Sequence, residues 1–433
     1  MLKKPHFLKR GYHSYYKYHK YDHLTRRNSP AGPAEYPADA EKNRREPTKN
    51  FRYIYSGQAF LSFAVSLIDP FITLFAYELG FMKSLIGIMT GLREFSTMLF
   101  SIVFAHLSDK MKRRKIFVLL GIFFWGLLFL PMINTRSIHL FFILVVGQGL
   151  VFSMSAPTWD AWFYEMTKKK NRANIVGNLH LIHYTFSFIA SVSASLLLRF
   201  MGIQFLFLLG FLCMIMIIAS LGRVKDAYES TKKRLVESNT FVLLRHYFSK
   251  QKALRQFTLL VFFWSLASTI TLGFLSIYIV KDLGASNSFL ALTVAVMVLS
   301  KLFTERIWEK AQARLGRKTC FIYGAVLTTL GLVGYAIAKD PILIVVANIV
   351  MGSGIGGFDM MGYLLMFDYV PEHNRAEYLA YFDTFTGIGS LLGPVIGGIL
   401  ASIFSISFII VLSIIAELIV IPFFFILEDK AIN

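Results

Sequence analysis

The sequence predicts an all-α membrane protein in which twelve transmembrane helices form two pseudo-symmetric six-helix bundles. Over 433 residues the chain is 55% hydrophobic and 16% charged, with a mean hydropathy of +0.55. A soluble domain is about a quarter charged, so charge is excluded here from long apolar blocks. Each block has the length that a helix needs to cross a bilayer, about 20 residues. An acid–arginine pattern that occurs twice further indicates two related halves.

The apolar runs occur as six, then a polar stretch, then six more. The first six predicted spans are residues 53–78, 84–106, 116–134, 138–164, 175–199 and 201–221. The second six are residues 257–280, 286–307, 319–338, 341–368, 377–402 and 406–427. As helices, all of them are long enough for a hydrocarbon core about 30 Å thick.

The domain boundaries follow from this pattern. We predict a disordered, basic cytoplasmic tail at 1–52, a six-helix bundle at 53–221, a cytoplasmic linker at 222–256, a second bundle at 257–428 and a tail at 429–433. The segment GYHSYYKYHKYDH of the first tail contains His and aromatic residues that a metal or nucleic acid can bind. Its composition fits better a solvated tail that is attracted to anionic lipid headgroups.

The lysine and arginine residues of the loops predict the orientation in the membrane. One set of loops is basic and comprises residues 110–115, 168–172, 222–256, 310–318 and Arg375. The opposite set contains only Lys83, Arg136, Arg199, Lys281 and Lys339. Cytoplasmic loops are enriched in Lys and Arg. We therefore expect a multi-pass protein of the cell (inner) membrane whose N- and C-termini are both cytoplasmic.

Other classes of protein are disfavoured by the sequence. The loop asymmetry explains the net charge of +19, so nucleic acid is not an expected partner. Cys213 and Cys320 lie in apolar segments, and no zinc-ligand spacing is present. The absence of a Gly-x4-Gly-Lys-Ser/Thr loop argues against an ATP-driven pump. We expect no enzyme activity, cofactor or metal, and a monomer whose partners are the lipid bilayer and a small-molecule substrate.

Each half contains an acid that is followed seven residues later by arginine and alanine. At the exit of the fourth span, Glu165 precedes Arg172 in EMTKKKNRA. At the exit of the tenth span, Asp368 precedes Arg375 in DYVPEHNRA. Parallel six-helix halves, related by an axis along the membrane normal, are typical of one transporter architecture.

The loop AHLSDKMKRRK at 105–115 resembles a signature of the major facilitator superfamily, Gly-x-Leu-x-Asp-x-x-Gly-Arg-Arg/Lys. The matching residues are Leu107, Asp109, Arg113 and Arg114, whereas Ala105 and Lys112 stand where the family has glycine. The resemblance covers about residues 53–428 and implies a transporter that opens alternately to the two sides of the membrane.

Two further segments resemble motifs of the same family. A second copy of the loop signature, EKAQARLGRK, keeps Gly316, Arg317 and Lys318 but has Ala313 in place of the acid. The segment GIGSLLGPVIGGIL at 387–400 is similar to the family's antiporter motif, although that motif belongs to the fifth span and this segment to the eleventh.

These motifs predict an ionic gate on the cytoplasmic face. A carboxylate near a helix N-terminus is stabilised by about 0.3–1 kcal/mol, so Asp109 is expected to cap the eleventh span near Glu377. Basic side chains are expected to bridge to acids when the protein faces outward and to part when it faces inward. The predicted gate residues are Asp109, Arg113, Arg114, Glu165, Arg172, Gly316, Arg317, Asp368 and Arg375. The alternative is that the basic residues only reflect membrane topology.

Ionisable residues inside a span are costly and therefore indicate function. Near half depth the predicted spans contain Asp69, Arg93, Glu94, His183 and Asp359, and Asp160 lies closer to the inner end. Asp69 and Arg93 are expected to pair, either in the substrate site or as a structural ion pair. His183 is expected to line the pathway or to make a hydrogen bond between helices. The candidate proton carriers are Asp359, Asp69 and Glu94, in that order.

Two tryptophans complete the predicted pathway. In the family that the chain resembles, the first, fourth, seventh and tenth spans line the cavity, which implies that Trp159 and Trp264 face the substrate. Contact with lipid explains both residues equally well. Glu417, in the twelfth span, has no partner that the sequence identifies.

The sequence thus favours a secondary active transporter that moves a small organic solute by alternating access, coupled to protons. The alternatives are a drug or metabolite exporter of the same fold and a transport-dead membrane sensor or scaffold. Arg93 favours an anionic ligand if Asp69 does not neutralise it, whereas the 42 Phe and 16 Met residues favour an apolar one. The substrate, the direction of transport and the coupling ion stay open.

Overall fold

The computed structural model describes residues 47–111, 113–167, 172–224, 252–370 and 375–428. Every regular element in these ranges is helical. The described residues from Lys49 onward form one compact unit. Most of the predicted N-terminal tail and linker, and the predicted C-terminal tail, lie outside the described residues.

The described helices follow the predicted spans to within a few residues. Before the linker they are α2 (Pro47–Glu78), α3 (Lys83–Met111), α4 (Arg114–Leu127), α5 (Phe129–Asn134), α6 (Ile138–Met166), α7 (Arg172–Leu197) and α8 (Ile203–Gly222). After it they are α10 (Lys252–Thr269), α11 (Leu275–Ile277), the π-helix η4 (Tyr278–Asp282), α12 (Asn287–Leu315), α13 (Arg317–Ile337), α14 (Pro341–Tyr369), α15 (Arg375–Ile403) and α16 (Ile406–Phe424).

The predicted seventh span is a broken helix. In the described part, 11 helices are long and apolar enough to cross a membrane, with α4 and α5 together as one of them. The remaining predicted span, 257–280, follows α10 to Thr269, passes Gly273 and continues in α11 and η4. Gly273 has a φ of 86°, a conformation that favours glycine and interrupts the helix. Each of the twelve predicted spans thus corresponds to described helical residues, the third as α4 and α5 and the seventh as α10, α11 and η4.

Side-chain caps begin four of these helices. The hydroxyls of Ser137, Ser286 and Ser405 accept from backbone N–H groups three residues later, in α6, α12 and α16. The Asp340 carboxylate accepts from Ile342 N at 2.8 Å at the start of α14. Ser and Asp are strong N-cap residues because they satisfy an otherwise unpaired N–H. These four caps fix where the chain re-enters the helical layer.

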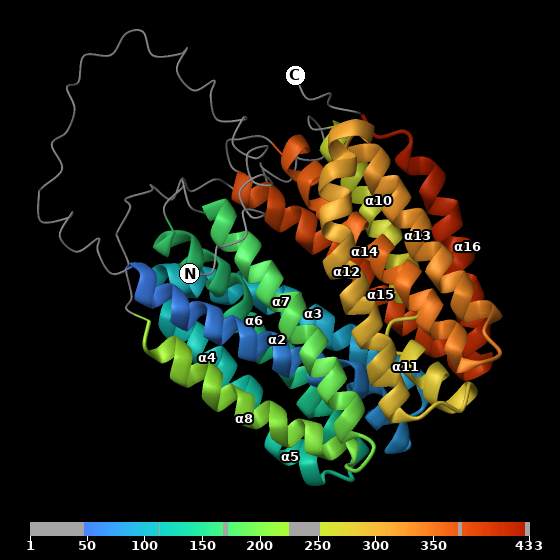
Figure 1. Ribbon diagram of the computed structural model, residues 1–433, viewed down its shortest axis with the longest axis horizontal. Coiled ribbons are helices and arrows are strands. Elements are labelled where there is room, and N and C mark those ends of the chain that lie inside the picture. Colours follow the sequence, from blue (N-terminus) through green and yellow to red (C-terminus); the bar gives the residue numbers. More distant parts are fainter. Residues whose placement is uncertain (1–46, 112, 168–171, 225–251, 371–374, 429–433) are drawn as a thin grey trace, which may run out of the picture. The chain divides into compact units, whose positions relative to one another are not determined.

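The helices form two groups that correspond to the halves of the sequence. In Figure 1 the blue to green helices, α2 to α8, gather on one side of the unit, and the yellow to red helices, α10 to α16, gather on the other. The groups are joined where α3 packs on α15 and where α7 packs on α12. In each contact the second span of one half meets the fifth span of the other half. This reciprocity is what a pseudo-twofold axis between the halves requires.

Two lysines show how closely the halves repeat. Lys115 Nζ donates to the carbonyls of Gly222 and Val224, which lie 107 and 109 residues further along the chain. In the second half, Lys318 Nζ donates to the carbonyls 107 and 109 residues after it, at the end of α16. In each half the lysine that begins the third span thus binds the carbonyl end of the sixth. Lysine there also complements the partial negative charge of a helix C-terminus.

The halves meet each other at equivalent positions far from these lysines. Thr73 Oγ1 and Ser276 Oγ lie 3.1 Å apart, and Lys281 Nζ donates to Glu78 Oε1 at 3.2 Å. In both pairs the partners are separated by 203 residues, which is also the spacing between Lys115 and Lys318. Residues that pair with their own counterparts lie near the pseudo-twofold axis. We call this end of the helices the closed end, and the end that carries Lys115 and Lys318 the basic end.

Apart from a hydrogen bond between Tyr184 and Glu305 near mid-span, the hydrogen bonds found between the halves, among described residues, lie at the closed end. Besides the two pairs above, Ser84 N donates to Ser402 Oγ at 2.8 Å, and Ser195 Oγ lies 3.2 Å from Ser288 Oγ. These bonds join the ends of α3 and α15 and of α7 and α12. They repeat the reciprocal pattern of the helix contacts.

The hydrophobic cores show the same polarity. One cluster combines both halves at the closed end and includes Phe75 of α2 and Tyr278 of η4. At the basic end each half has a cluster of its own, one around Trp162 and one around Phe321. The halves therefore share a core at the closed end and have separate cores at the basic end.

Candidate functional site

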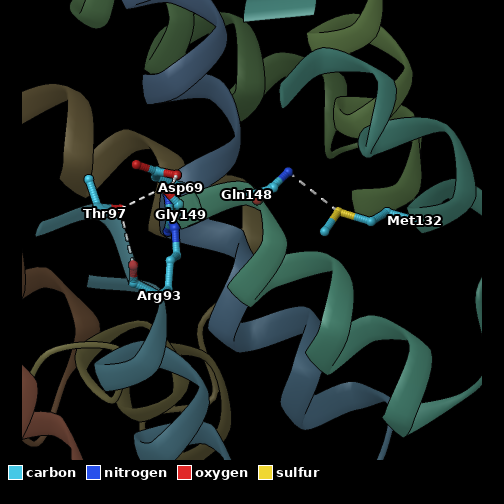
Figure 2. Close-up of polar contacts among 6 residues, drawn as sticks. All are labelled: Asp69, Arg93, Thr97, Met132, Gln148 and Gly149. Carbon is cyan, nitrogen blue, oxygen red and sulfur yellow. Dashed lines mark hydrogen bonds and ion pairs between the residues drawn. The ribbon is translucent and has the colours of Figure 1, made fainter. Parts of the chain in front are cut away.

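Asp69 of α2 and Arg93 of α3 form the predicted ion pair at mid-span. Arg93 Nη2 donates to Asp69 Oδ1 at 2.8 Å, and Figure 2 shows the two residues side by side. The Asp69 side chain is 38% exposed and that of Arg93 21%, so the pair is half-buried. Asp69 neutralises Arg93 in this state. The condition under which Arg93 would favour an anionic ligand is therefore not met.

The backbone beneath Arg93 is held rigidly by α6. A Cβ at Gly149 would lie 2.2 Å from the Arg93 carbonyl oxygen, so only glycine allows α6 to approach α3 so closely. The Thr97 hydroxyl lies 3.0 Å from the Arg93 carbonyl and 3.2 Å from the Gly149 carbonyl, which ties the two helices together. The neighbouring Gln148 points the other way, toward Met132 (Figure 2). The cation of the pair thus sits on a fixed support.

Glu94 adds a third charge beside this pair. One residue further along α3, it lies about 100° around the helix from Arg93. Its side chain is half-buried and within electrostatic reach of both Arg93 and Asp69. Among the described residues it has no hydrogen-bond partner. The first half therefore presents a neutralised pair and one additional carboxylate.

A second group of ionisable residues lies where α7, α12 and α14 meet. Of its members, the sequence placed only Asp359 in the predicted pathway, although His180 also lies within a predicted span. Lys301 and Glu305 are one turn apart on α12, and Lys301 is within electrostatic reach of both Glu305 and Asp359. From α7, Tyr184 interacts with Glu305, and His180 also lies within electrostatic reach of that carboxylate. We call these five residues the α7–α12–α14 cluster. The missed signal was two charges four residues apart inside an apolar run.

The backbone geometry explains why this cluster forms. A Cβ at Gly356 of α14 would lie 3.6 Å from Lys301 Cα, so the two helices run close together beside Lys301. Trp308 Nε1 donates to the Ser353 carbonyl at 2.9 Å and fixes the same contact one turn away. Asp359 lies one turn after Gly356 and is exposed although it is in the middle of α14. Because Tyr184 of the other half also lies within its electrostatic reach, Asp359 faces the space between the halves.

His183 has the structural role that sequence reasoning offered as its alternative. Its Nδ1 lies 3.0 Å from Ser62 Oγ, and Gln58 Nε2 donates to the same hydroxyl at 3.1 Å. These bonds connect α7 to α2 within the first half. The predicted hydrogen bond between helices is thus present.

The predicted tryptophans differ in their surroundings. Trp159 is half-buried and contacts Trp162 edge to face, with ring centroids 6.0 Å apart. Trp264 is 4% exposed and stacks on Phe358 at a centroid distance of 4.8 Å, within the core of the second half. The prediction that Trp264 lines the cavity is wrong for this state, because α14 and α16 cover its ring. The side chain of Asp160 lies outside the described residues.

At the basic end the clearest ion pair lies within one half. Arg317 Nη1 contacts both carboxylate oxygens of Asp368 at 2.6 Å and so links α13 to α14. Asp368 was predicted to bridge to the basic residues of the cytoplasmic face, and the partner found here, Arg317, belongs to the same half. Gly316, with a φ of 83°, makes the turn between α12 and α13.

The other predicted gate residues are described only in part. Arg113 is exposed just before α4, and Arg114 is half-buried at its first residue. The side chains of Asp109, Glu165, Arg172 and Arg375 lie outside the described residues. Whether Asp109 caps the eleventh span stays a prediction.

Glu417, which the sequence left without a partner, is enclosed in the second half. Its side chain is 1% exposed, and Thr329 Oγ1 donates to its Oε2 at 2.7 Å. In the first half the equivalent contact is apolar: Met214 packs against Gly126. Glu417 therefore links α13 to α16 and does not face the space between the halves.

A helical membrane protein of two pseudo-symmetric halves, with charged residues between them at mid-span, is a membrane transporter by architecture. The family model of the Major Facilitator Superfamily matches residues 54–274 and 257–432. The chain belongs to this superfamily, as the resemblance of its loops implied.

The chain is also similar to two curated bacterial proteins. The chain is 24% identical over 364 residues to the uncharacterized MFS-type transporter YuxJ of Bacillus subtilis (strain 168), covering 80% of this chain and 90% of that protein. It is 27% identical over 144 residues to the quinolone resistance protein NorA of Staphylococcus aureus, covering 33% of this chain and 37% of NorA.

Solved structures share the fold. A mutant form of the nucleoside transporter NupG matches with a TM-score of 0.75 at 14% identity, covering 87% of this chain and 99% of that one. An inward-facing bacterial homologue of the lysosomal transporter Spinster matches with a TM-score of 0.67 at 12% identity, covering 88% of this chain and 97% of that one. At these identities the likeness concerns the fold alone.

Proposed function

We propose that the chain is a proton-coupled secondary active transporter that moves a small organic solute by alternating access. The observation that carries the proposal is the position of the charged residues. The Asp69–Arg93 pair and the α7–α12–α14 cluster lie midway along the helices. Apart from the Tyr184–Glu305 bond within that cluster, the hydrogen bonds between the halves, among the described residues, lie at one end. Ionisable residues at this depth are expensive and are typically retained for transport.

In this proposal the basic end faces the cytoplasm, following the bias of Lys and Arg. The described state is then open toward the cytoplasm and closed outside. Rocking of the halves breaks the bonds of the closed end and brings the basic ends together. Asp109, Glu165, Arg172 and Arg375 are the proposed partners of the inner gate in that opposite state.

Asp359 is the proposed proton carrier. It is exposed to the space between the halves, whereas Asp69 is engaged by Arg93. A carboxylate that water can reach from one side, and that the rocking of the halves presents to the other side, can take up and release a proton. Glu94 is the second candidate because it lacks a hydrogen-bond partner among the described residues.

Export of drugs or metabolites is a second candidate function. NorA and the Multidrug resistance protein 3 of Bacillus subtilis (strain 168) are similar to 33% and 28% of this chain. The names of these relatives point to efflux, but only a third of the sequence or less supports the comparison. A transport-dead sensor or scaffold predicts instead that Asp109→Asn and Arg375→Ala leave the phenotype unchanged.

A thermal-shift screen of the purified protein against metabolites and drugs at two pH values would test this function. A ligand raises the melting temperature according to its affinity, so a pH-dependent shift identifies solute and coupling together. In proteoliposomes the solute should then accumulate, and a protonophore should abolish the accumulation. Asp359→Asn should remove both the pH dependence and the accumulation, whereas Glu309→Gln, at an exposed acid of α12, should preserve them. Simple equilibration of the solute would contradict proton coupling.

A further inference from the structure

Three charges of the α7–α12–α14 cluster make no direct ion pair among the described residues, unlike the pair in the other half, although Tyr184 donates a hydrogen bond to Glu305. Asp69 and Arg93 are in contact at 2.8 Å. Among the described residues, Lys301, Glu305 and Asp359 have no ion pair within the 4.0 Å limit of such contacts, although they lie within electrostatic reach of one another. These residues therefore do not neutralise each other through a direct ion pair.

The mid-span charges do not balance. The carboxylates named above are Asp69, Glu94, Glu305 and Asp359, and the arginine and lysine residues are Arg93 and Lys301. Since Asp69 and Arg93 cancel, the surplus belongs to Glu94 and to the α7–α12–α14 cluster. A low-dielectric site with surplus negative charge is stabilised by a bound cation.

Two features of α7 complement this charge. Tyr184 presents an aromatic ring at the cluster and contacts His183 edge to face, with ring centroids 5.1 Å apart. Aromatic faces attract organic cations. The Ser187 side chain, one turn beyond Tyr184 on the same face of α7, is only 2% exposed, and its hydroxyl has no hydrogen-bond partner among the described residues. A buried polar group without a partner is rare in a finished structure and indicates a position that a ligand or water occupies.

We propose that the α7–α12–α14 cluster binds an organic cation, with Glu305 and Asp359 as its counter-charges. This inference rests on the proposed transport function and names the charge class of its solute. Lys301 then acts as the internal competitor: its ammonium attracts the same two carboxylates and weakens the hold on the solute. Because α7 and α12 belong to different halves, the bound cation contacts both halves, as alternating access requires.

Two probes of similar size and shape but opposite charge test the proposal on the unmodified protein. Tetraphenylphosphonium should raise the melting temperature of the purified protein, and tetraphenylborate should not do so through this site. The specific signal is the part of the melting-temperature shift that is lost in the double variant Glu305→Gln/Asp359→Asn. Comparison with this variant removes any shift caused by partition of a probe into detergent. The unliganded melting temperatures of all variants show that they are folded.

The proposal predicts whether each single substitution lowers or raises the affinity for tetraphenylphosphonium. Glu305→Gln and Asp359→Asn should each lower the affinity for tetraphenylphosphonium about tenfold, because each removes one charge-assisted contact. Lys301→Met should strengthen binding by about threefold because a competing cation is removed. A residue with a merely structural role would not increase affinity when it is replaced. Glu309→Gln, the same chemical change one turn beyond Glu305, should bind like the unmodified protein.

The proposal is overturned if tetraphenylphosphonium gives no specific shift, if tetraphenylborate binds as well, or if the two acid variants keep full affinity. Transport of another solute that a protonophore abolishes would then leave the transport function standing without this charge class. Absence of gradient-driven movement for every solute of the screen would instead reject the transport function itself. The two failures are thus distinguishable.

Discussion

The two halves of this transporter agree at their ends and differ at mid-span. Lys115 and Lys318 make the same pair of hydrogen bonds to the end of the sixth span of their own half. At mid-span the first half contains a closed ion pair, Asp69–Arg93, where the second half has Leu272 and Val296 at the equivalent positions. Lys301, Glu305 and Asp359 of the second half, which make no direct ion pair among the described residues, likewise correspond to the uncharged Met98, Ile102 and Ala156 of the first half.

In the proposed function, this difference separates residues that stabilise the fold from residues that bind the solute. The equivalent residues would hold each bundle together while the two bundles rock about a common axis. A solute site need not obey the pseudo-twofold relation of the halves, so its groups can differ between its two sides. We expect substitutions at matched positions to change stability equally in both halves, and substitutions at mid-span to have unequal effects.

The largest expected inequality is between the two mid-span cations. Arg93→Met leaves Asp69 unpaired at half depth, and breaking such a pair is expected to cost about 2–3 kcal/mol, less than for a fully buried pair because this one is half-exposed. Lys301→Met breaks no direct ion pair among the described residues and should cost less than about 1 kcal/mol. Chemical denaturation of the purified variants measures both, with Asp69→Asn/Arg93→Met as the control that restores neutrality. Equal losses for Arg93→Met and Lys301→Met would refute the contrast.

The matched lysines should behave alike. Lys115→Ala and Lys318→Ala each remove two hydrogen bonds to carbonyls at a helix end, so each should destabilise the protein by about 1–2 kcal/mol. The two losses should agree within about 0.5 kcal/mol, and they should add in the double variant because the sites are independent. Melting curves of the three variants decide this. A large loss of stability in one half alone would show that the two lysines contribute unequally to stability although their hydrogen bonds are equivalent.

The smallest effect is expected at the closed end. Glu78 and Lys281 are each about one-third exposed, so Glu78→Gln should weaken the junction of the halves by only about 0.5 kcal/mol. That corresponds to about a twofold rise in the population open at this end. The rate at which a membrane-impermeant reagent labels Ser276→Cys measures this population. Lys339→Gln, an exposed charge at the same end, is the matched control and should leave the labelling rate unchanged.

The sequence predicted the features that depend only on position along the chain, namely span length and depth in the membrane. Apolar run length gave the spans, and matched depth on consecutive antiparallel helices gave the Asp69–Arg93 pair. It could not predict which face of a helix meets which neighbour. The sequence around Trp264 is compatible with a position in a cavity or in a core. The packing of α14 and α16 against its ring determines that it lies in the core. The approach of Lys301 to Asp359 likewise depends on the contact of α12 with α14 at Gly356.

The central claim is that transport requires the closed end to open, and a reversible cross-link tests it most directly. In a background with Cys213 and Cys320 replaced, Thr73→Cys/Ser276→Cys joins the halves where their hydroxyls lie 3.1 Å apart. Ser56→Cys/Ser220→Cys joins two helices within the first half at a similar distance, 3.2 Å, and is the control. Oxidation should stop solute flux in the first variant alone, and reduction should restore it. Undiminished flux through the cross-linked Thr73→Cys/Ser276→Cys protein would contradict the account.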